Sequence, residues 1–281
     1  MMPSYSSLFA CARRILALYS EECCESDAMG LLCEASGRSR TSVIMDFRRQ
    51  ASFDEAARYA SFIRRRASGE PFAYITGHRE FMSLDFEVSA KCLIPRPETE
   101  LLCEHILSLP SENRDPMLDL CCGSGCIGIS VAVYDRNCEV YASDISSGAL
   151  SVAENNAKKH GVDGRMRFFL GDMFSNIPEG VRFGAIASNP PYIGIGERIP
   201  RDVADFEPHE ALFSGADGTD ASRKIIDSAP HYLKEGGVLA IEINSARAEE
   251  IRRMFENAGF SDISVIKDYA GLDRIVSGIK K

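Results

Sequence analysis

The sequence predicts an α/β protein with an open, doubly wound parallel sheet, preceded by a small helical domain and a β-hairpin. Three observations predict this fold. Short apolar segments alternate with helical segments from Met117 onward, a glycine-rich turn follows the first apolar segment, and residues 5–68 show helical periodicity alone. At 281 residues, the chain is long enough for one larger and one smaller domain.

The amino-terminal part of the chain is predicted to be helical. Its apolar residues recur near helical spacing, at Leu8, Ile15 and Leu16 and again at Phe53, Ala57, Ala60 and Ile63. From Phe72 to Ile94 the composition shifts to β-branched and aromatic residues, and a hairpin is expected around Ser83-Leu84. We expect a helical domain over 1–77, a β-hairpin and linker over 78–97, and the sheet domain over 98–281.

The sheet domain is predicted from strands that alternate with helices. The five best strands are expected at 117–120, 139–143, 166–170, 183–188 and 238–243. The helices of this domain are expected near 98–109, 126–133, 148–160 and 222–233. A later helix should end at Gly259, because glycine adopts the left-handed cap conformation easily. Short strands at 263–267 and 274–277 complete the predicted sheet.

Charge and composition restrict the class of partner. The net charge of −9 disfavours indiscriminate binding to nucleic acid, and no stable nucleic-acid complex is expected. Residues 1–80 contain 11 Arg, no Lys and 10 acidic residues, so the negative excess lies in the rest of the chain. The amino-terminal part is therefore the better candidate for contact with an acidic partner.

The sequence also indicates where the protein is located and whether it binds a metal ion. No apolar run approaches the length of a membrane span, and the first residues do not resemble a signal peptide, so we expect a cytoplasmic protein without membrane contact. The 10 cysteines are expected to be reduced thiols. Cys121, Cys122 and Cys126 lack a second ligand pair at zinc spacing, so no metal site is expected.

A glycine-rich turn, Asp119-Leu120-Cys121-Cys122-Gly123-Ser124-Gly125, lies between a predicted strand and a predicted helix. Its glycines let the backbone approach a ligand that a Cβ atom would exclude, which predicts a nucleotide-type cofactor. The pattern Gly123-x-Gly125-x-x-Gly128 also matches the dinucleotide fingerprint. The turn alone therefore does not distinguish between cofactors.

Two acidic residues follow the next predicted strands. Asp144 is placed where a carboxylate can accept hydrogen bonds from both ribose hydroxyls of a bound nucleoside. Asp172 could accept a hydrogen bond from the adenine amino group while Met173 packs on the ring; alternatively, Asp172 is a helix cap or turn residue. These residues and the glycine-rich turn are expected to line a crevice at the carboxyl edge of the sheet.

A tetrad, Asn189-Pro190-Pro191-Tyr192, follows the fourth predicted strand and is expected to face the cofactor across the crevice. The Asn189 side-chain carbonyl and the Pro190 backbone carbonyl can accept the two N–H bonds of a planar amide or amine. The prolines restrict both backbones, and Tyr192 offers a flat apolar face. The tetrad thus predicts catalysis by positioning of a nitrogen; a plain Pro-Pro turn is the alternative.

With these motifs, the sequence resembles the HemK/PrmC family, which methylates the glutamine of the Gly-Gly-Gln motif in class 1 peptide chain release factors. The resemblance covers nearly the whole chain. It includes residues 69–77 and 94–100, the glycine-rich turn, the tetrad, Phe206-Glu207-Pro208 and residues 268–271. DNA adenine methyltransferases share the tetrad, so the segments 69–77 and 94–100 carry the specificity of the resemblance.

The resemblance implies a Rossmann-like class I methyltransferase sheet, S-adenosyl-L-methionine as cofactor, and release factors as the protein substrate. It implies cofactor contacts at Cys121 to Gly125, Asp144, Met173 and Asn189, and substrate contacts at Asn189 to Tyr192. The helices of 1–77 resemble the family's release-factor-recognition domain. Some relatives have glycine in place of Cys121 and an aromatic residue in place of Met173, so adenine stacking on Met173 should be weaker.

Other functions share some of these motifs. An adenine N6 amino group presents a similar planar nitrogen to Asn189, so methylation of adenine in nucleic acid is the main alternative. An NAD-dependent oxidoreductase could use the same glycine-rich turn, and a non-catalytic binding module would not need Asn189. Glu98, Glu100 and Glu242 are each compatible with a role at the site or with capping and solvation alone.

Overall fold

The computed structural model describes residues 2–18 and 24–281, and the chain divides into two compact units. A helical unit comprises Met1–Gly77 and Ile199–Phe206, and a sheet unit comprises His78–Arg198 and Glu207–Lys281. Helix α10 (Arg201–Phe206) therefore belongs to the helical unit, although the segments on either side of Ile199–Phe206 belong to the sheet unit. No local pattern in the sequence indicated this excursion.

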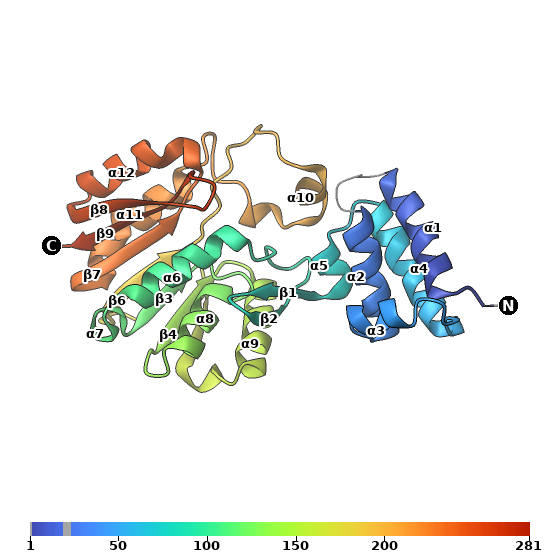
Figure 1. The fold of residues 1–281 in the computed structure, drawn as a ribbon. Coiled ribbons are helices and arrows are strands. Elements are labelled where there is room, and N and C mark those ends of the chain that lie inside the picture. The colour runs from blue at the N-terminus through green and yellow to red at the C-terminus, as the bar shows by residue number, and fades with distance from the viewer. Residues whose placement is uncertain (1, 19–23) are drawn as a thin grey trace. The chain divides into compact units, whose positions relative to one another are not determined.

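The first part of the helical unit contains short helices around an apolar core (Figure 1). They are α1 (Tyr5–Ala17), α2 (Cys24–Ser36), α3 (Arg40–Met45), α4 (Phe53–Ala67) and α5 (Phe72–Thr76). Helix α4 begins with a capping box. Ser52 Oγ accepts a hydrogen bond from the backbone N–H of Glu55, and the Glu55 carboxylate accepts one from the backbone N–H of Ser52. The helical interpretation of residues 5–68 is confirmed for the part of it that the structure describes.

The connecting segment differs from the sequence expectation in two places. Residues 72–76 form helix α5, not extended backbone, because Pro71 precedes the helix, Gly77 ends it at φ +80°, and burial of Tyr74 and Ile75 outweighs their β propensity. The hairpin of β1 (His78–Phe81) and β2 (Leu84–Glu87) turns at Met82-Ser83, one residue earlier than expected. The Met82 backbone N–H donates to Glu100 Oε1 at 2.7 Å, which holds that turn.

The main sheet has seven strands in the order β5-β4-β3-β6-β7-β9-β8, in which β9 runs antiparallel to both of its neighbours, β7 and β8. They are β3 (Met117–Leu120), β4 (Val140–Asp144), β5 (Met166–Leu170), β6 (Phe183–Ser188), β7 (Leu233–Glu242), β8 (Phe260–Lys267) and β9 (Asp273–Lys280). Strand order reverses between β3 and β6, which confirms the doubly wound arrangement. The loops after these two strands therefore lie side by side at the carboxyl edge.

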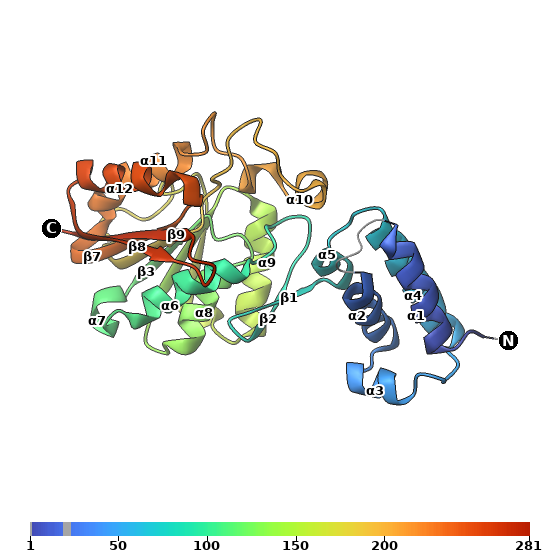
Figure 2. The same ribbon diagram turned by 45° about the horizontal axis from the view of Figure 1, so that its top comes forward.

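Helices cover both faces of this sheet (Figure 2). One face carries α6 (Glu100–Ser108), α8 (Cys126–Tyr134) and α9 (Ser147–Lys159), and the other carries α11 (Asp220–Tyr232) and α12 (Ala248–Asn257). The remaining short elements are α7 (Ser111–Arg114), η1 (Pro97–Thr99), η2 (Asp163–Arg165), η3 (His209–Ala211) and η4 (Ser245–Arg247). Gly259 follows α12 at φ +87°, as its predicted role at the helix end requires.

The nine cysteines within 2–18 and 24–281 form no disulfide, and Cys23 lies outside the described residues. Among the described helices, none is long and apolar enough to cross a membrane. Within the same residues, no group of three or more His, Cys, Asp and Glu side chains is placed to hold a metal ion.

A buried ion pair joins α7 to the end of α8, and we expect it to be important for stability. Arg114 Nε lies 2.8 Å from Asp135 Oδ2, both side chains are 8% exposed, and Arg114 Nη1 also donates to the Leu107 carbonyl. Replacing Arg114 by Ala leaves a buried carboxylate without its partner, so the free energy of unfolding should fall by about 3–5 kcal/mol. Urea unfolding followed by circular dichroism measures this change.

Arg252 of α12 provides the matched control, because its ion pairs with Glu249 and Glu256 are on the surface. Arg252→Ala should change the free energy of unfolding by less than about 1 kcal/mol. Equal losses for the two variants would contradict the role given to the buried pair.

Candidate active site

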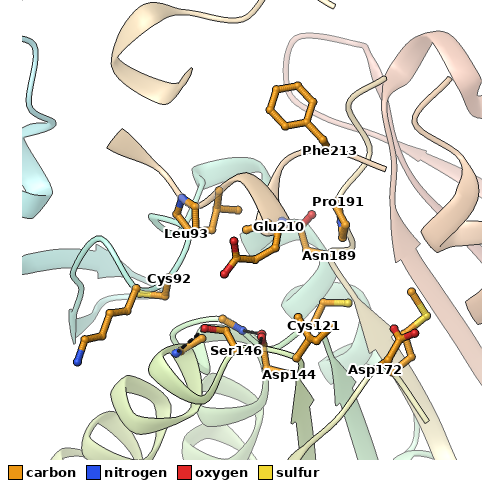
Figure 3. A pocket seen from close by; sticks show the side chains of 17 residues that line it. Cys92, Leu93, Cys121, Asp144, Ser146, Asp172, Asn189, Pro191, Glu210 and Phe213 are labelled. Carbon is orange, nitrogen blue, oxygen red and sulfur yellow. Dashed lines mark hydrogen bonds between the residues drawn. The ribbon is translucent and has the colours of Figure 1, made fainter. Parts of the chain in front are cut away.

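A cavity of about 270 Å³ lies at the carboxyl edge of the sheet, where strand order reverses. Figure 3 shows its walls: Asp144 ends β4, Cys121, Ser146 and Asn189 come from the loops after β3, β4 and β6, and Glu210 and Phe213 come from a segment later in the chain. The predicted site residues that line it are Cys121, Gly123, Asp144, Asp172, Met173, Asn189 and Pro191. Four separate strand ends thus contribute to one cavity.

The glycine-rich turn and Asp144 form one wall of the cavity. Asp144 Oδ2 accepts from the Gly123 backbone N–H at 2.8 Å, and its Oδ1 accepts from that of Ser146 at 2.9 Å. Burial raises the pKa of Asp144, and the negative charge of Glu210 adds to the effect. Each carboxylate oxygen keeps a lone pair with which it can accept a ligand hydroxyl.

Four of the predicted cofactor residues, Asp119, Cys122, Ser124 and Gly125, lie behind the cavity wall. Asp119 is fully buried, and its Oδ2 accepts from the Gly128 backbone N–H at 2.9 Å. Burial raises the pKa of Asp119 to about 7. A Cβ atom on Gly125 would lie 2.8 Å from Ile129 and 3.1 Å from Ala153. These residues hold the turn in shape rather than face the cavity.

The loop after β5 contributes Asp172 and Met173 to the cavity lining. The Asp172 side chain is 56% exposed, and its Oδ2 lies 3.7 Å from Lys224 Nζ. Met173 has a left-handed backbone at φ +52°, and its carbonyl accepts from Ser143 Oγ at 2.7 Å. The hydrogen bond from β4 therefore fixes the loop that carries both residues.

The tetrad is held by hydrogen bonds from two distant segments. Asn189 Nδ2 donates to Thr99 Oγ1 at 3.1 Å, and Thr99 Oγ1 donates to Glu242 Oε2 at 2.7 Å. The Tyr192 hydroxyl donates to the other Glu242 oxygen at 3.3 Å. Glu242 ends β7, which pairs with β6 directly before the tetrad. Both ends of the tetrad are therefore connected to one buried carboxylate.

Burial sets the electrostatics of this network. Glu242 and Thr99 are each 1% exposed. Burial raises the pKa of Glu242 to about 7, although the hydrogen bond from Thr99 and the positive charge of Arg274 oppose the shift. Burial and the nearby Glu242 charge also raise the pKa of Tyr192, so its hydroxyl keeps its proton. Glu242 can therefore change its charge in the neutral pH range while Tyr192 cannot.

A second buried glutamate connects two segments near the cavity. Glu207 Oε2 accepts from the Ile94 backbone N–H at 3.2 Å, and Glu207 Oε1 accepts from Arg96 Nη2 at 2.5 Å. The residues next to these two segments line the cavity, although none of them was predicted as a site residue: Lys91, Cys92, Leu93, Pro208, Glu210, Ala211 and Phe213. The only signal for them was that residues 94–100 and 206–208 belong to the family resemblance.

The arrangement combines three chemical features in one space. Asp144 offers a carboxylate to hydroxyl groups, Met173 and Phe213 offer apolar surface, and Asn189 borders the same cavity with its amide. The acidic side chains of Asp144, Asp172 and Glu210 outnumber the basic side chain of Lys91 in the lining, which favours a ligand that carries positive charge. A cationic nucleoside and a planar nitrogen group therefore suit this site.

Comparisons with known proteins match both units. The family model described as PrmC N-terminal domain matches residues 8–77, and the one described as methyltransferase small domain matches residues 97–204. The release factor glutamine methyltransferase of Clostridium acetobutylicum is 37% identical over 96% of this chain and 96% of its own length. The protein of that name from Koribacter versatilis is 41% identical over 83% of this chain and 82% of its own length.

Solved structures with low sequence identity share the fold. The catalytic domain of hMettl16 superimposes with a TM-score of 0.56 at 12% identity, over 80% of this chain and 81% of that one. A methyltransferase from Pyrococcus furiosus superimposes with a TM-score of 0.53 at 20% identity, over 70% of this chain and 89% of that one. These likenesses concern the α/β sheet architecture alone.

Proposed function

The chain belongs to the family of release factor glutamine methyltransferases, and from this premise we propose that it methylates the glutamine of the Gly-Gly-Gln motif in class 1 peptide chain release factors. The methyl group would pass from the sulfonium of S-adenosylmethionine to the side-chain amide N5, with S-adenosylhomocysteine as the leaving group and loss of one N–H proton from the amide. One observation carries this proposal: the Asn189 amide is held at the wall of a cavity that suits a cationic nucleoside.

The residues that line the cavity support S-adenosylmethionine as the cofactor. Asp144 would accept hydrogen bonds from the ribose hydroxyls, Met173 would pack on the adenine, and Asp172 would accept from its amino group. Gly123 lines the cavity at φ +56°, a conformation that glycine adopts readily, and it lacks the Cβ atom that would keep a ligand from its backbone. When bound, the cofactor supplies a methyl group on a positively charged sulfonium.

Asn189 and Pro190 would position the nitrogen of the substrate. The Asn189 side-chain carbonyl and the Pro190 backbone carbonyl accept the two N–H bonds of the glutamine amide, which aims the nitrogen lone pair at the methyl group. An amide nitrogen is a weak nucleophile, so alignment within the site supplies much of the rate enhancement. The Tyr192 ring packs beside the planar amide. Residues 1–77 would recognise the release factor.

Methyl transfer to a purified release factor tests this proposal. With tritiated S-adenosylmethionine, we expect label in the wild-type factor and none in a factor whose Gly-Gly-Gln glutamine is replaced by Ala. DNA and RNA serve as parallel substrates, because an adenine amino group would fit the same two carbonyls. Label in nucleic acid and none in the factor would favour adenine methylation and overturn the proposal.

A further inference from the structure

Glu242 and Thr99 lie behind the tetrad, connected to it by hydrogen bonds. We infer that they act as a positioning relay that fixes which end of the Asn189 amide faces the substrate. The relay makes Asn189 present its carbonyl oxygen, and not its NH₂ group, to the reacting nitrogen. This inference rests on the proposed function and deepens it, because a reversed Asn189 would place a donor against the N–H bonds of the glutamine.

The direction of the relay follows from the hydrogen-bonding capacity of each group. An ionised carboxylate only accepts hydrogen bonds, so Thr99 Oγ1 must donate its single proton to Glu242 Oε2 across 2.7 Å. The same oxygen can then only accept from Asn189, across 3.1 Å. Asn189 must therefore turn Nδ2 toward Thr99, which leaves Oδ1 for the substrate.

The relay is needed because the two ends of an amide have nearly the same shape. Packing alone distinguishes them poorly, whereas hydrogen-bond partners distinguish them clearly. Thr99 and Glu242 are buried, so water does not offer a competing partner that would relax the preference. The second Glu242 oxygen accepts from Tyr192, so the same carboxylate also orients the ring at the other end of the tetrad.

The charge on Glu242 controls the relay, and several groups act on that charge. Arg274 of β9 favours the ionised form, Glu98 of η1 opposes it, and Tyr192 and Thr99 stabilise it by donation. The buried thiols of Cys103 and Cys126 have raised pKa values and stay neutral. Since burial raises the Glu242 pKa to about 7, turnover should be full above that pH and fall as Glu242 becomes protonated below it.

Steady-state kinetics of four variants test the relay. Thr99→Val removes the hydroxyl, and Glu242→Gln replaces the carboxylate by a group that can face Thr99 with either end. Each should lower kcat on the order of 10²-fold, while the affinity for S-adenosylmethionine changes less than about threefold. Thr99→Ser keeps the hydroxyl and should retain kcat within about threefold. The double variant, Thr99→Val with Glu242→Gln, should have a kcat no lower than that of the slower single variant, because both residues act on Asn189 through the same hydrogen bonds.

The pH profile provides a readout that a merely structural role would not move. Wild-type kcat should decline below about pH 7, and Thr99→Val should lose this decline. Asp135→Asn is the matched control, because Asp135 is also buried and accepts a hydrogen bond, from Arg114 Nε at 2.8 Å, and does not line the cavity. It should keep the wild-type pH profile of kcat.

The outcomes separate this inference from the proposed function. A wild-type enzyme that does not label the release factor contradicts the function. An active wild type with unchanged kcat in Thr99→Val, or with losses that multiply in the double variant, overturns the relay. Thermal unfolding and calorimetric binding of S-adenosylmethionine identify variants that fail to fold. If Glu242→Gln is among them, the contrast between Thr99→Val and Thr99→Ser decides the question.

Discussion

Replacing Asn189 by Ala should lower kcat for methyl transfer about 10³-fold, the largest effect expected of any single side chain in this site. The change removes the carbonyl that we propose to accept one N–H bond of the glutamine amide, and with it the alignment of the nitrogen. Thr99 Oγ1 would also lose the hydrogen bond that it accepts from Asn189 Nδ2. Single-turnover kinetics at saturating S-adenosylmethionine measure the change.

Asn244 is the matched control for this prediction, because its side chain caps η4 by accepting from the Ala246 backbone N–H and does not line the cavity. Asn244→Ala should keep kcat within about twofold, since it removes only a local cap. Calorimetry should show that Asn189→Ala still binds S-adenosylmethionine. An Asn189→Ala enzyme with wild-type kcat would remove the tetrad from the mechanism.

Replacing Asp144 by Ala should weaken the binding of S-adenosylmethionine about 10²-fold, since hydrogen bonds to a charged group contribute about 1.5–3 kcal/mol each. Asp144 has two roles here: it faces the cavity, and it accepts from the backbone N–H groups of Gly123 and Ser146. Its loss removes an acceptor for the ribose and loosens the turn beside it. Isothermal calorimetry measures the dissociation constant directly.

Asp172 is the comparison for this prediction, because it borders the same cavity but its side chain is 56% exposed. Water can replace much of what an exposed carboxylate offers, so Asp172→Ala should cost less than about tenfold in affinity. If the two variants lost affinity equally, or if Asp144→Ala bound as wild type does, the ribose contact assigned to Asp144 would be wrong.

The sheet could be predicted because its strands and turns are local features. The strands 117–120, 166–170 and 183–188 are found at the expected bounds, since each is a short apolar run between turn residues. Helix α5 could not be predicted in this way, because Phe72–Thr76 has β-type composition and becomes helical through burial. The conformation of a segment departs from its local propensity where tertiary packing contributes more free energy than that propensity does.

The residues of the site that lie at strand ends could also be predicted from local features. Asp144 and Asn189 each directly follow or end a strand, so topology alone brings them to one edge. The contact between Thr99 and Glu242 joins residues 143 positions apart, and no local pattern encodes it. Phe213 and Leu93 reach the cavity from segments joined through Glu207, again over a long sequence separation.

Tandem mass spectrometry of a release factor incubated with the enzyme and S-adenosylmethionine tests the central claim most directly. The peptide that contains Gly-Gly-Gln should gain the mass of a single methyl substitution, and its fragments should place the added mass on the glutamine side chain. The Asn189→Ala enzyme, treated in parallel, should leave the peptide unchanged. A methyl group on another residue, or an unmodified peptide after incubation with folded wild-type enzyme that binds S-adenosylmethionine, would contradict the account.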